Sequence, residues 1–441
     1  MKGFLLALVS ALVLAPPTGA QEKAPSLREE RREVIRFGIE TELGELLAAL
    51  KSEKDVSLVK EILALLETAP AGRIRKEIFD YFMEVRSPEA RSAAAGLLAR
   101  WEDEPPELLV SVLGYLAAVG SSAPPEEIHP LLEARSAQVV SAAVRYLGAV
   151  KATRSGARLR ELFDSPDAGL QIRQEIILAL GEMQDPDSVP FLMDLLGDEG
   201  RDMMLRRFAC DALGRSGDTR ALGAIKTALE SKDNLLRSYA VSALGRFPGR
   251  ETVNTLISAL RDAFPRVREL AAERLGDLQA RDAVEILLYR ARRDPEKRVR
   301  QASFRSLSKI GGGEAVDFLQ DYLAGEKNPV DFRSLAAEEL IKNRPAAAVE
   351  PLLKTMEQEW LKDRSALLDG VCRLASQAEY SGFDALYEKM LGHRSFVIQI
   401  YGIRGIQRNR IGRLRGAVQE FTRETYHPQI RRIAAAALED L

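Results

Sequence analysis

Three histidines and two cysteines are the side chains that most readily suggest chemistry in this 441-residue sequence. The histidines, His129, His393 and His427, lie far apart along the chain. A zinc site takes about four closely spaced Cys and His ligands, and the distant Cys210 and Cys372 do not provide them. A Ser-His-Asp triad stays open, because its members converge in space, but the sequence has no Gly-x-Ser-x-Gly elbow. We therefore predict no catalytic residue, no metal site and no cofactor, and we interpret the protein as a non-enzyme.

A glycine-rich segment, GGGEAV from Gly311, is the nearest approach to a phosphate-binding loop. It lacks the Gly-Lys-Ser/Thr ending of a P-loop and follows no strand pattern. We interpret it as a turn between helices.

The composition favours helices and a balanced surface charge. Lysine and arginine number 63 against 65 aspartate and glutamate, and the isoelectric point is near 6.2. Dedicated nucleic-acid-binding domains are usually strongly basic, so we predict no nucleic-acid partner. Aromatic residues make up 6% of the chain, while Ala, Leu, Glu and Arg are abundant, a mixture that favours helix over sheet.

Residues 1–20, MKGFLLALVSALVLAPPTGA, have the pattern of a secretory signal peptide. Lys2 precedes an apolar run from Phe4 to Ala15, and small residues end at Ala20. A run of about twelve apolar residues is too short for a hydrocarbon core, which needs roughly twenty. We expect cleavage after Ala20 and a periplasmic or secreted mature chain with no transmembrane segment.

Eleven-residue phrases related to VRELAAERLGD (267–277) recur along the chain. Each has an aliphatic anchor, and the anchors lie about 31–34 residues apart, a period typical of helical repeats. The anchors are Leu116, Leu147, Leu180, Leu213, Leu244, Leu275, Leu307, Leu340, Leu374 and Ile406. The residues twelve positions later are also aliphatic: Ile128, Leu159, Leu192, Ile225, Leu256, Leu287, Leu319, Leu352, Leu386 and Val418.

Each repeat is predicted to form two helices. The first ends near the anchor, where Gly or a polar turn such as GRSGDTR (214–220) stops it. The second carries apolar residues twelve and sixteen positions after the anchor. Asp294 and Pro295 are expected to be the N-cap and first residue of a helix.

Four segments are predicted from this pattern. Residues 1–20 form the signal peptide, and residues 21–104 form an N-terminal helical segment whose repeat spacing is out of phase with the rest. Residues 105–426 form the repeat array, and residues 427–441 form a C-terminal half-repeat that caps it.

Phrases such as LRRFACDALGRSGDTRALGAIKTAL (205–229) resemble bacterial HEAT repeats of the phycobilisome-lyase type. The resemblance is strongest over residues 136–360 and implies an all-α fold, a right-handed α-solenoid of HEAT-like helical hairpins. Some related proteins, the deoxyhypusine hydroxylases, hold iron with His-Glu pairs, but no histidine in this chain precedes Glu. Bilin attachment gains no support from the cysteines. The fixed residues are packing residues, so the resemblance specifies fold more than function.

Two recurring features are interpreted as structural. Cys210 and Cys372 occupy small or apolar repeat positions, and we predict buried thiols without a bridge. An Arg recurs seven positions before the anchor, and we expect it to pair with a neighbouring acid or turn carbonyl. It appears as Arg173, Arg206, Arg237, Arg268, Arg300, Arg333 and Arg431.

The second helices of the C-terminal half are predicted to display an acidic stripe, because solenoids bind partners through successive repeats. Positions ten, fourteen and seventeen after the anchor lie on the face opposite the core. The stripe is expected on the concave wall; the alternative is an ordinary solvated helix face. Its partner-binding candidates are Glu285, Tyr289, Asp317, Asp321, Glu350, Glu357, Asp384 and Glu388.

A basic segment, YGIRGIQRNRIGRLR (401–415), follows the stripe and contains no acid. It is a candidate for binding an anionic polymer, lipid headgroup or acidic partner, unless its arginines are ordinary solvated ones. The anion-binding candidates are Arg404, Arg408, Arg410, Arg413 and Arg415. Trp101 and Trp360 are further interface candidates, or partly buried core residues.

The sequence thus predicts an exported, non-catalytic scaffold or adaptor that binds a protein partner of unknown identity along its repeats. The alternative is an envelope-associated protein that binds an anionic envelope polymer or lipid through the C-terminal arginines.

Overall fold

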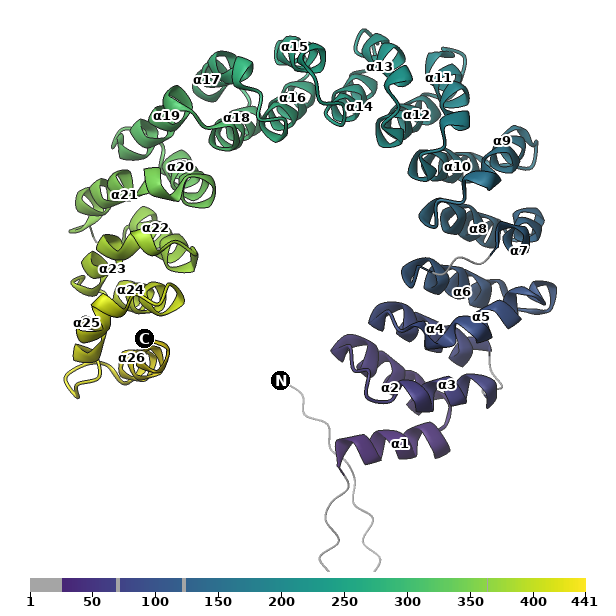
Figure 1. Ribbon diagram of the computed structural model, residues 1–441, viewed down its shortest axis with the longest axis horizontal. Helices are drawn as coiled ribbons and strands as arrows, with labels where there is room; N and C mark the ends of the chain where they lie inside the picture. The colour runs from purple at the N-terminus through teal and green to yellow at the C-terminus, as the bar shows by residue number, and fades with distance from the viewer. Residues whose placement is uncertain (1–25, 69–71, 121–123, 363) are drawn as a thin grey trace, which may run out of the picture. The chain divides into compact units, whose positions relative to one another are not determined.

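The computed structural model describes residues 26–68, 72–120, 124–362 and 364–441. Within these ranges the regular structure consists of 26 α-helices and short 3-10 turns, with no strand. Stacked helical hairpins form the predicted all-α solenoid (Figure 1). The predicted signal peptide, residues 1–20 with its cleavage site at Ala20, lies outside the described residues.

The chain divides into two compact units, residues 1–146 and 147–441, with the boundary inside α8. The predicted boundary at residue 104 falls within the first unit. The first eight helices are α1 (Leu27–Phe37), α2 (Glu40–Glu53), α3 (Val59–Thr68), α4 (Gly72–Val85), α5 (Arg91–Leu98), α6 (Pro106–Ala118), α7 (Pro125–Ile128) and α8 (Ala137–Ala149).

The second unit contains two rows of helices. In Figure 1 the first helices of its hairpins lie on the concave side of this unit, and we call them the inner row. The inner row comprises α10 (Leu170–Met183), α12 (Met203–Ser216), α14 (Asn234–Leu244), α16 (Pro265–Asp277), α18 (Lys297–Ile310), α20 (Val330–Asn343), α22 (Ala366–Gln377), α24 (Phe396–Arg408) and α26 (Pro428–Asp440). The outer row comprises α9 (Gly156–Asp164), α11 (Val189–Gly197), α13 (Leu222–Ala228), α15 (Arg250–Ala259), α17 (Val284–Arg293), α19 (Gly313–Ala324), α21 (Pro345–Glu359), α23 (Asp384–Leu391) and α25 (Arg415–Glu420).

The predicted apolar columns form the core. Every residue of the column twelve positions after the anchor is at most 1% exposed, from Ile128 to Val418. The anchors from Leu213 to Leu340 are all fully buried at 0%. Burying one such side chain stabilises the fold by roughly 1.5–3 kcal/mol, and stacking makes the core continuous from hairpin to hairpin.

One predicted anchor, Leu374, is one residue away from the residue that occupies the anchor position in the structure. In α22 the fully buried residue is Ala375, whereas Leu374 is only half-buried. The Tyr387 hydroxyl donates a hydrogen bond to the Ala375 carbonyl at 2.8 Å. The large buried ring of Tyr387 packs next to a small anchor, so the expected Leu is absent from this position.

The N-terminal segment is in phase with the rest, so the expectation of a separate spacing is wrong. Leu50, Ile62 and Leu66 keep the spacing of anchor, plus twelve and plus sixteen, and all three are buried. In the next repeat the anchor is Phe82, also fully buried. This repeat has Phe at the anchor and Ala94 twelve residues later, where most repeats have leucine, so a search for regularly spaced leucines does not find it.

The glycine after the anchor lies inside the first helix and does not stop it. Gly181 is in α10 and Gly214 is in α12. A Cβ added at Gly181 would lie 2.7 Å from the Cα of Ala212, and one at Gly214 would lie 2.7 Å from the Cα of Ala243. These glycines therefore permit close approach of successive inner helices.

We expect the Gly181→Ala substitution to lower the free energy of unfolding by about 1–3 kcal/mol, because the added methyl group meets a neighbouring backbone. Gly370→Ala in α22 is the matched control, since a Cβ there has open space. The control should raise stability by about 0.5–1 kcal/mol, the helix preference for Ala over Gly. Urea unfolding followed by circular dichroism measures both, and equal effects would contradict the close-approach role.

Five of the seven recurring arginines pair as the sequence predicts, and they hold the hairpins together. Arg300 instead lies over the Phe332 ring, 4.3 Å from its centroid, and Arg431 has no such partner among the described residues. Arg173 and Arg206 donate to the carbonyl oxygens of Phe163 and Leu196, at 3.0 and 2.9 Å. Arg333 donates to the Leu323 carbonyl at 2.8 Å and pairs with Glu359. These contacts fasten an inner helix to the ends of outer helices.

A second buried pair joins Arg268 to Asp294. The guanidinium donates two hydrogen bonds to the carboxylate, at 2.9 and 2.8 Å, and a third to the Asp262 carbonyl at 2.9 Å. The Asp294 side chain is 0% exposed and also accepts the Glu296 N–H at 3.0 Å. Helix α18 begins only at Lys297, so the expected N-cap role of Asp294 is wrong. The carboxylate instead fixes the turn between α17 and α18.

Acid should weaken this network. Burial by itself would raise the pKa of Asp294, but hydrogen bonds from Arg268 and the Glu296 N–H outweigh it, and the pKa falls below its ordinary value of 3.8. The folded state therefore favours the ionised carboxylate, and its stabilising effect is full above about pH 4 and is lost as pH falls through the lowered pKa. We expect the stability difference between wild type and Asp294→Asn to narrow below pH 3.8 in urea unfolding. A constant difference between pH 7 and pH 3 would contradict this assignment.

The cysteines and the glycine-rich turn also match the expectations. Cys210 and Cys372 are free thiols, both 0% exposed, and burial raises the pKa of each to about 12. Gly311 and Gly312 have φ values of 69° and 88° and form the turn between α18 and α19.

Candidate binding surfaces

The acidic stripe lies on the outer row of the second unit. Its residues come from α17, α19, α21 and α23, and all are exposed except Asp384, which is half-buried. In Figure 1 these helices lie on the convex side of the unit, so the expected concave position is wrong. The closely packed first helices, with glycine at the contacts, occupy the concave side instead.

Intramolecular ion pairs divide the stripe into two parts. Glu357 pairs with Lys389 at 3.0 Å, and Arg413 pairs with Asp384 and Glu388 at 2.5 and 3.6 Å. Burial would raise the pKa of Asp384, but the Arg413 hydrogen bond and charge lower it. The remaining acids have no ion pair among the described residues: Glu285, Asp317, Asp321 and Glu350.

A groove between α15 and α17 contains the first two stripe residues, Glu285 and Tyr289. Its volume is about 420 Å³, and Ile257 and Ile286 supply apolar lining. Tyr289 is 58% exposed, and the Arg290 guanidinium lies 5.5 Å from its ring centroid. An exposed aromatic side chain beside apolar and acidic groups is a suitable anchor for a basic protein segment. Ile257 belongs to the preceding repeat. The predicted stripe comprises equivalent positions of successive helices, and those positions do not identify Ile257 as a neighbour of Tyr289.

The structure separates the five anion-binding candidates. Arg413 pairs with acids of α23, and Arg415 donates to the Leu438 carbonyl at 3.0 Å. The other three, Arg404, Arg408 and Arg410, line one groove on the inner row.

This second groove, which we call the inner groove, lies along α22, α24 and α26 and has a volume of about 760 Å³. Its lining residues are Arg373, Ser376, Gln377, Tyr401, Arg404, Gln407, Arg408, Arg410 and Asp440. Arg373 was missed in the sequence because it lies about 30 residues before the basic segment. The repeat period would have found it, since one period places successive inner helices side by side.

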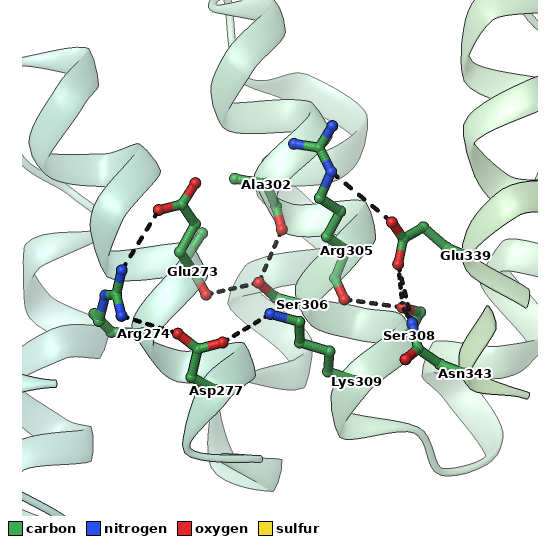
Figure 2. Close-up of polar contacts among 11 residues, drawn as sticks. Glu273, Arg274, Asp277, Ala302, Arg305, Ser306, Ser308, Lys309, Glu339 and Asn343 are labelled. Atoms are coloured by element: carbon green, nitrogen blue, oxygen red, sulfur yellow. Dashed lines mark hydrogen bonds and ion pairs between the residues drawn. The ribbon is translucent and has the colours of Figure 1, made fainter. Parts of the chain in front are cut away.

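In the middle of the inner row, polar side chains of three successive helices pair with one another. Figure 2 shows a network across α16, α18 and α20. Asp277 accepts from Arg274 and Lys309 at 3.0 and 2.7 Å. The buried Glu339 carboxylate accepts from the Ser308 hydroxyl at 2.8 Å and the Asn343 amide at 3.1 Å. Charges here stabilise helix stacking and leave few groups for a ligand.

The histidines have structural surroundings. His393 is 5% exposed; its Nδ1 accepts the Ser395 N–H at 2.9 Å, and its Nε2 lies 3.3 Å from the Trp360 carbonyl. His427 accepts the Gln429 N–H at 3.2 Å and caps α26. His129 lies in the first unit, at the turn 129–133. Among the described residues, no group of three His, Cys, Asp or Glu side chains is placed to hold a metal ion.

The two tryptophans are half-buried. The Trp360 ring lies edge-on to His393, with centroids 4.6 Å apart, and Lys389 lies above it at 5.3 Å. These contacts favour a packing role. In the described part of the chain, no helix combines the length and apolar character required to cross a membrane.

Comparison with solved structures identifies the same architecture in importin-β. Yeast importin-β (Kap95p) covers 93% of this chain and 67% of its own, with 14% identity and a TM-score of 0.57. The Kap95 chain of a Kap95:Nup1 complex covers the same shares, with 13% identity and a TM-score of 0.57. The complex of CpcE and CpcF of phycocyanin lyase from Nostoc sp. PCC7120 matches with 17% identity over 73% of this chain and 95% of its own, at a TM-score of 0.32. At these identities the likeness to importin-β shows the fold alone.

Curated relatives match over a short segment. Deoxyhypusine hydroxylase from Rattus norvegicus is 35% identical over 60 residues, which is 14% of this chain and 20% of the relative. The Homo sapiens protein is 37% identical over 68 residues, 15% of this chain and 22% of the relative. The chain thus spans about a fifth of the length of these relatives.

A family model described as spirochaete HEAT repeat protein matches residues 35–437. This match includes the in-phase N-terminal repeats and almost all of the described helices. The chain therefore belongs to the spirochaete HEAT repeat protein family.

Proposed function

We propose that this protein is a non-catalytic scaffold that binds a protein partner along the outer row of its second unit. The observation that carries the proposal is the set of exposed acids on successive outer helices, Glu285, Asp317, Asp321 and Glu350, which have no ion pair among the described residues. The same helix positions also hold the exposed bases Arg292 and Lys354, but acids predominate, and a predominantly acidic row steers a basic surface toward it. Tyr289 adds an exposed aromatic anchor in the adjacent groove.

The family and fold support a binding role. Solenoids display the same helix of successive repeats on one surface, which suits extended partners. In the Kap95:Nup1 complex a chain of similar fold is bound to another protein. We propose a non-catalytic role for two reasons. The match to deoxyhypusine hydroxylase covers only 20% of that enzyme, and this chain has none of the His-Glu pairs that hold iron in such enzymes.

The test is a pull-down from envelope extract with residues 21–441 as bait, read by mass spectrometry. One bait carries Asp317→Lys, Asp321→Lys and Glu350→Lys. The matched control carries Glu230→Lys, Glu326→Lys and Glu338→Lys, three exposed acids outside the stripe that also lack an ion pair among the described residues. Circular dichroism establishes that both baits are folded.

We expect the stripe variant to capture a specific partner at least tenfold less than wild type, and the control to capture it normally. Equal capture by the two variants would remove the site from the outer row. Loss with both would indicate a dependence on net charge alone.

Export is a further part of the proposal. The pattern of residues 1–20 supports cleavage after Ala20 and a periplasmic or secreted location. N-terminal sequencing of the protein purified from its native cells should begin at Gln21. A sequence that begins at Met1 would contradict export by this route.

A further inference from the structure

The inner groove has a lining of predominantly one sign of charge, unlike the groove between α15 and α17, where two acids face two arginines. Four arginines and one aspartate line it, and four positive charges minus one negative charge leave a net charge of three. Arg373 comes from α22, Arg404 and Arg408 come from α24, and Arg410 follows α24 directly. Charges from two neighbouring inner helices therefore face one space.

The packing of α24 orients these side chains. Gly402 and Gly405 are buried against α23, and a Cβ at Gly405 would lie 2.3 Å from the Tyr387 ring. Tyr401, Arg404 and Arg408 follow helical spacing on another face, where Arg404 and Arg408 are exposed. The close contact with the outer helix thus directs the arginines to the inner side.

These arginines have little charge compensation within the chain. Arg373, Arg404 and Arg410 form no ion pair with any described residue, and Arg408 reaches only the exposed Glu379 at 3.8 Å. This differs from Arg413, which two acids neutralise, and from the satisfied network of Figure 2. Structural pairing therefore does not account for the groove arginines.

We propose that the inner groove binds an acidic, extended peptide segment of a protein partner. Guanidinium groups bind carboxylates with paired hydrogen bonds. Neutral polar groups in the lining, Ser376, Gln377 and Gln407, can bond to a peptide backbone between the carboxylates. The inference rests on the proposed function in one respect, that the array binds protein, but it assigns a second surface and the opposite charge.

Two features favour a peptide over a phosphate polymer or a lipid surface. Asp440 lies in the lining, where Gln407 donates to it at 2.6 Å, and its carboxylate can accept a peptide N–H, a donor that a phosphate polymer does not offer. The helices that line the groove also lie on the concave side of the unit (Figure 1), which a flat bilayer reaches less easily than a convex side.

The length of the segment follows from helix spacing. Packed helices lie about 8–10 Å apart, so crossing from α22 to α26 takes roughly 16–20 Å. An extended chain rises about 3.3 Å per residue, and about five or six residues span the groove. A hexapeptide is therefore a suitable probe.

The test measures fluorescence anisotropy of fluorescein-labelled hexaglutamate with the full mature chain. We expect saturable binding that weakens with added salt and falls at least tenfold in Arg373→Glu/Arg404→Glu. Arg250→Glu/Arg298→Glu is the matched control, because these exposed arginines also lack an ion pair among the described residues. The control and Arg413→Gln should bind normally, and circular dichroism should show all variants folded.

The other outcomes overturn the proposal. Equal loss with the control would indicate binding to net positive charge, and equal binding of labelled hexaglutamine would remove the role of the carboxylates. Binding of polyphosphate or phosphatidylglycerol vesicles without hexaglutamate binding would assign the groove to a polymer or a lipid. If none of these probes binds, the inner groove does not bind anionic ligands and the proposal is wrong.

The two proposals, for the acidic stripe and for the inner groove, can be tested independently. Asp317→Lys/Asp321→Lys/Glu350→Lys should leave hexaglutamate binding intact, because the stripe lies on the other row. If hexaglutamate does not bind while stripe-dependent capture persists, the inference fails and the proposed function stands.

Discussion

We expect the Asp294→Ala substitution to lower the free energy of unfolding by about 3–5 kcal/mol, the usual cost of breaking a buried ion pair. The Arg268 guanidinium, itself 8% exposed, would remain in the core without its two carboxylate bonds. The Glu296 N–H would also lose its acceptor. Urea unfolding by circular dichroism gives the total loss, and hydrogen exchange of the α16 and α18 amides locates it.

Two comparisons test the cause. Glu420→Ala removes an exposed ion pair with Arg423, at 2.7 Å, and should cost at most about 1 kcal/mol. Replacing both buried partners, as Arg268→Met/Asp294→Leu, should recover much of the loss, because no uncompensated charge remains. A loss below 1 kcal/mol for Asp294→Ala would show that water reaches the pair.

The Phe304→Ala substitution should have a similar effect, a loss of about 3–5 kcal/mol. Phe304 is fully buried in α18, and its ring centroid lies 5.1 Å from Phe318, 4.8 Å from Tyr322 and 5.3 Å from Phe332. The substitution removes one hydrophobic side chain and three aromatic contacts, two within the α18–α19 hairpin and one, with Phe332, to the next hairpin.

Two control substitutions test whether the loss depends on the buried volume of the side chain and on its burial. Phe304→Leu keeps most of the buried volume and should cost clearly less than Phe304→Ala. Leu361→Ala changes a side chain that is 81% exposed and should stay within about 0.5 kcal/mol of wild type. Equal losses for Phe304→Ala and Phe304→Leu in urea unfolding would show that the aromatic contacts, rather than the volume, decide stability at this site.

The two surfaces give the protein different electrostatic faces within one unit. The outer row presents unpaired acids with Tyr289, and the inner groove presents four arginines, three of them without an ion pair among the described residues, with Tyr401. Because the net charge of the whole chain is only −2, this segregation is invisible in the composition. If both proposals hold, the scaffold contacts a basic segment on the outer helices α17, α19 and α21 and an acidic segment on the inner helices α22, α24 and α26 of the following hairpins.

The sequence by itself determined the repeat, its core and its recurring arginine. These are local properties: a 31–34-residue period repeats the same packing problem, so the residues that solve it, such as Leu213 and Ile225, recur in register. The burial of both cysteines followed from the same register. Where a side chain of another size solves the packing, as Phe82 and Ala375 do, the pattern was lost or shifted by one residue.

The tertiary structure decided which row faces inward, what the glycines do and which charges remain open. The spacing of apolar residues and the polarity of the exposed face are the same for a helix on the concave side and for one on the convex side. The sequence therefore could not decide on which side the acidic stripe lies. Gly181 resembles a helix stop until the neighbouring Ala212 backbone is seen against it. Arg413 and Arg404 are alike in sequence, but only the structure brings acids to one and leaves the other in a groove, because the partners come from different repeats.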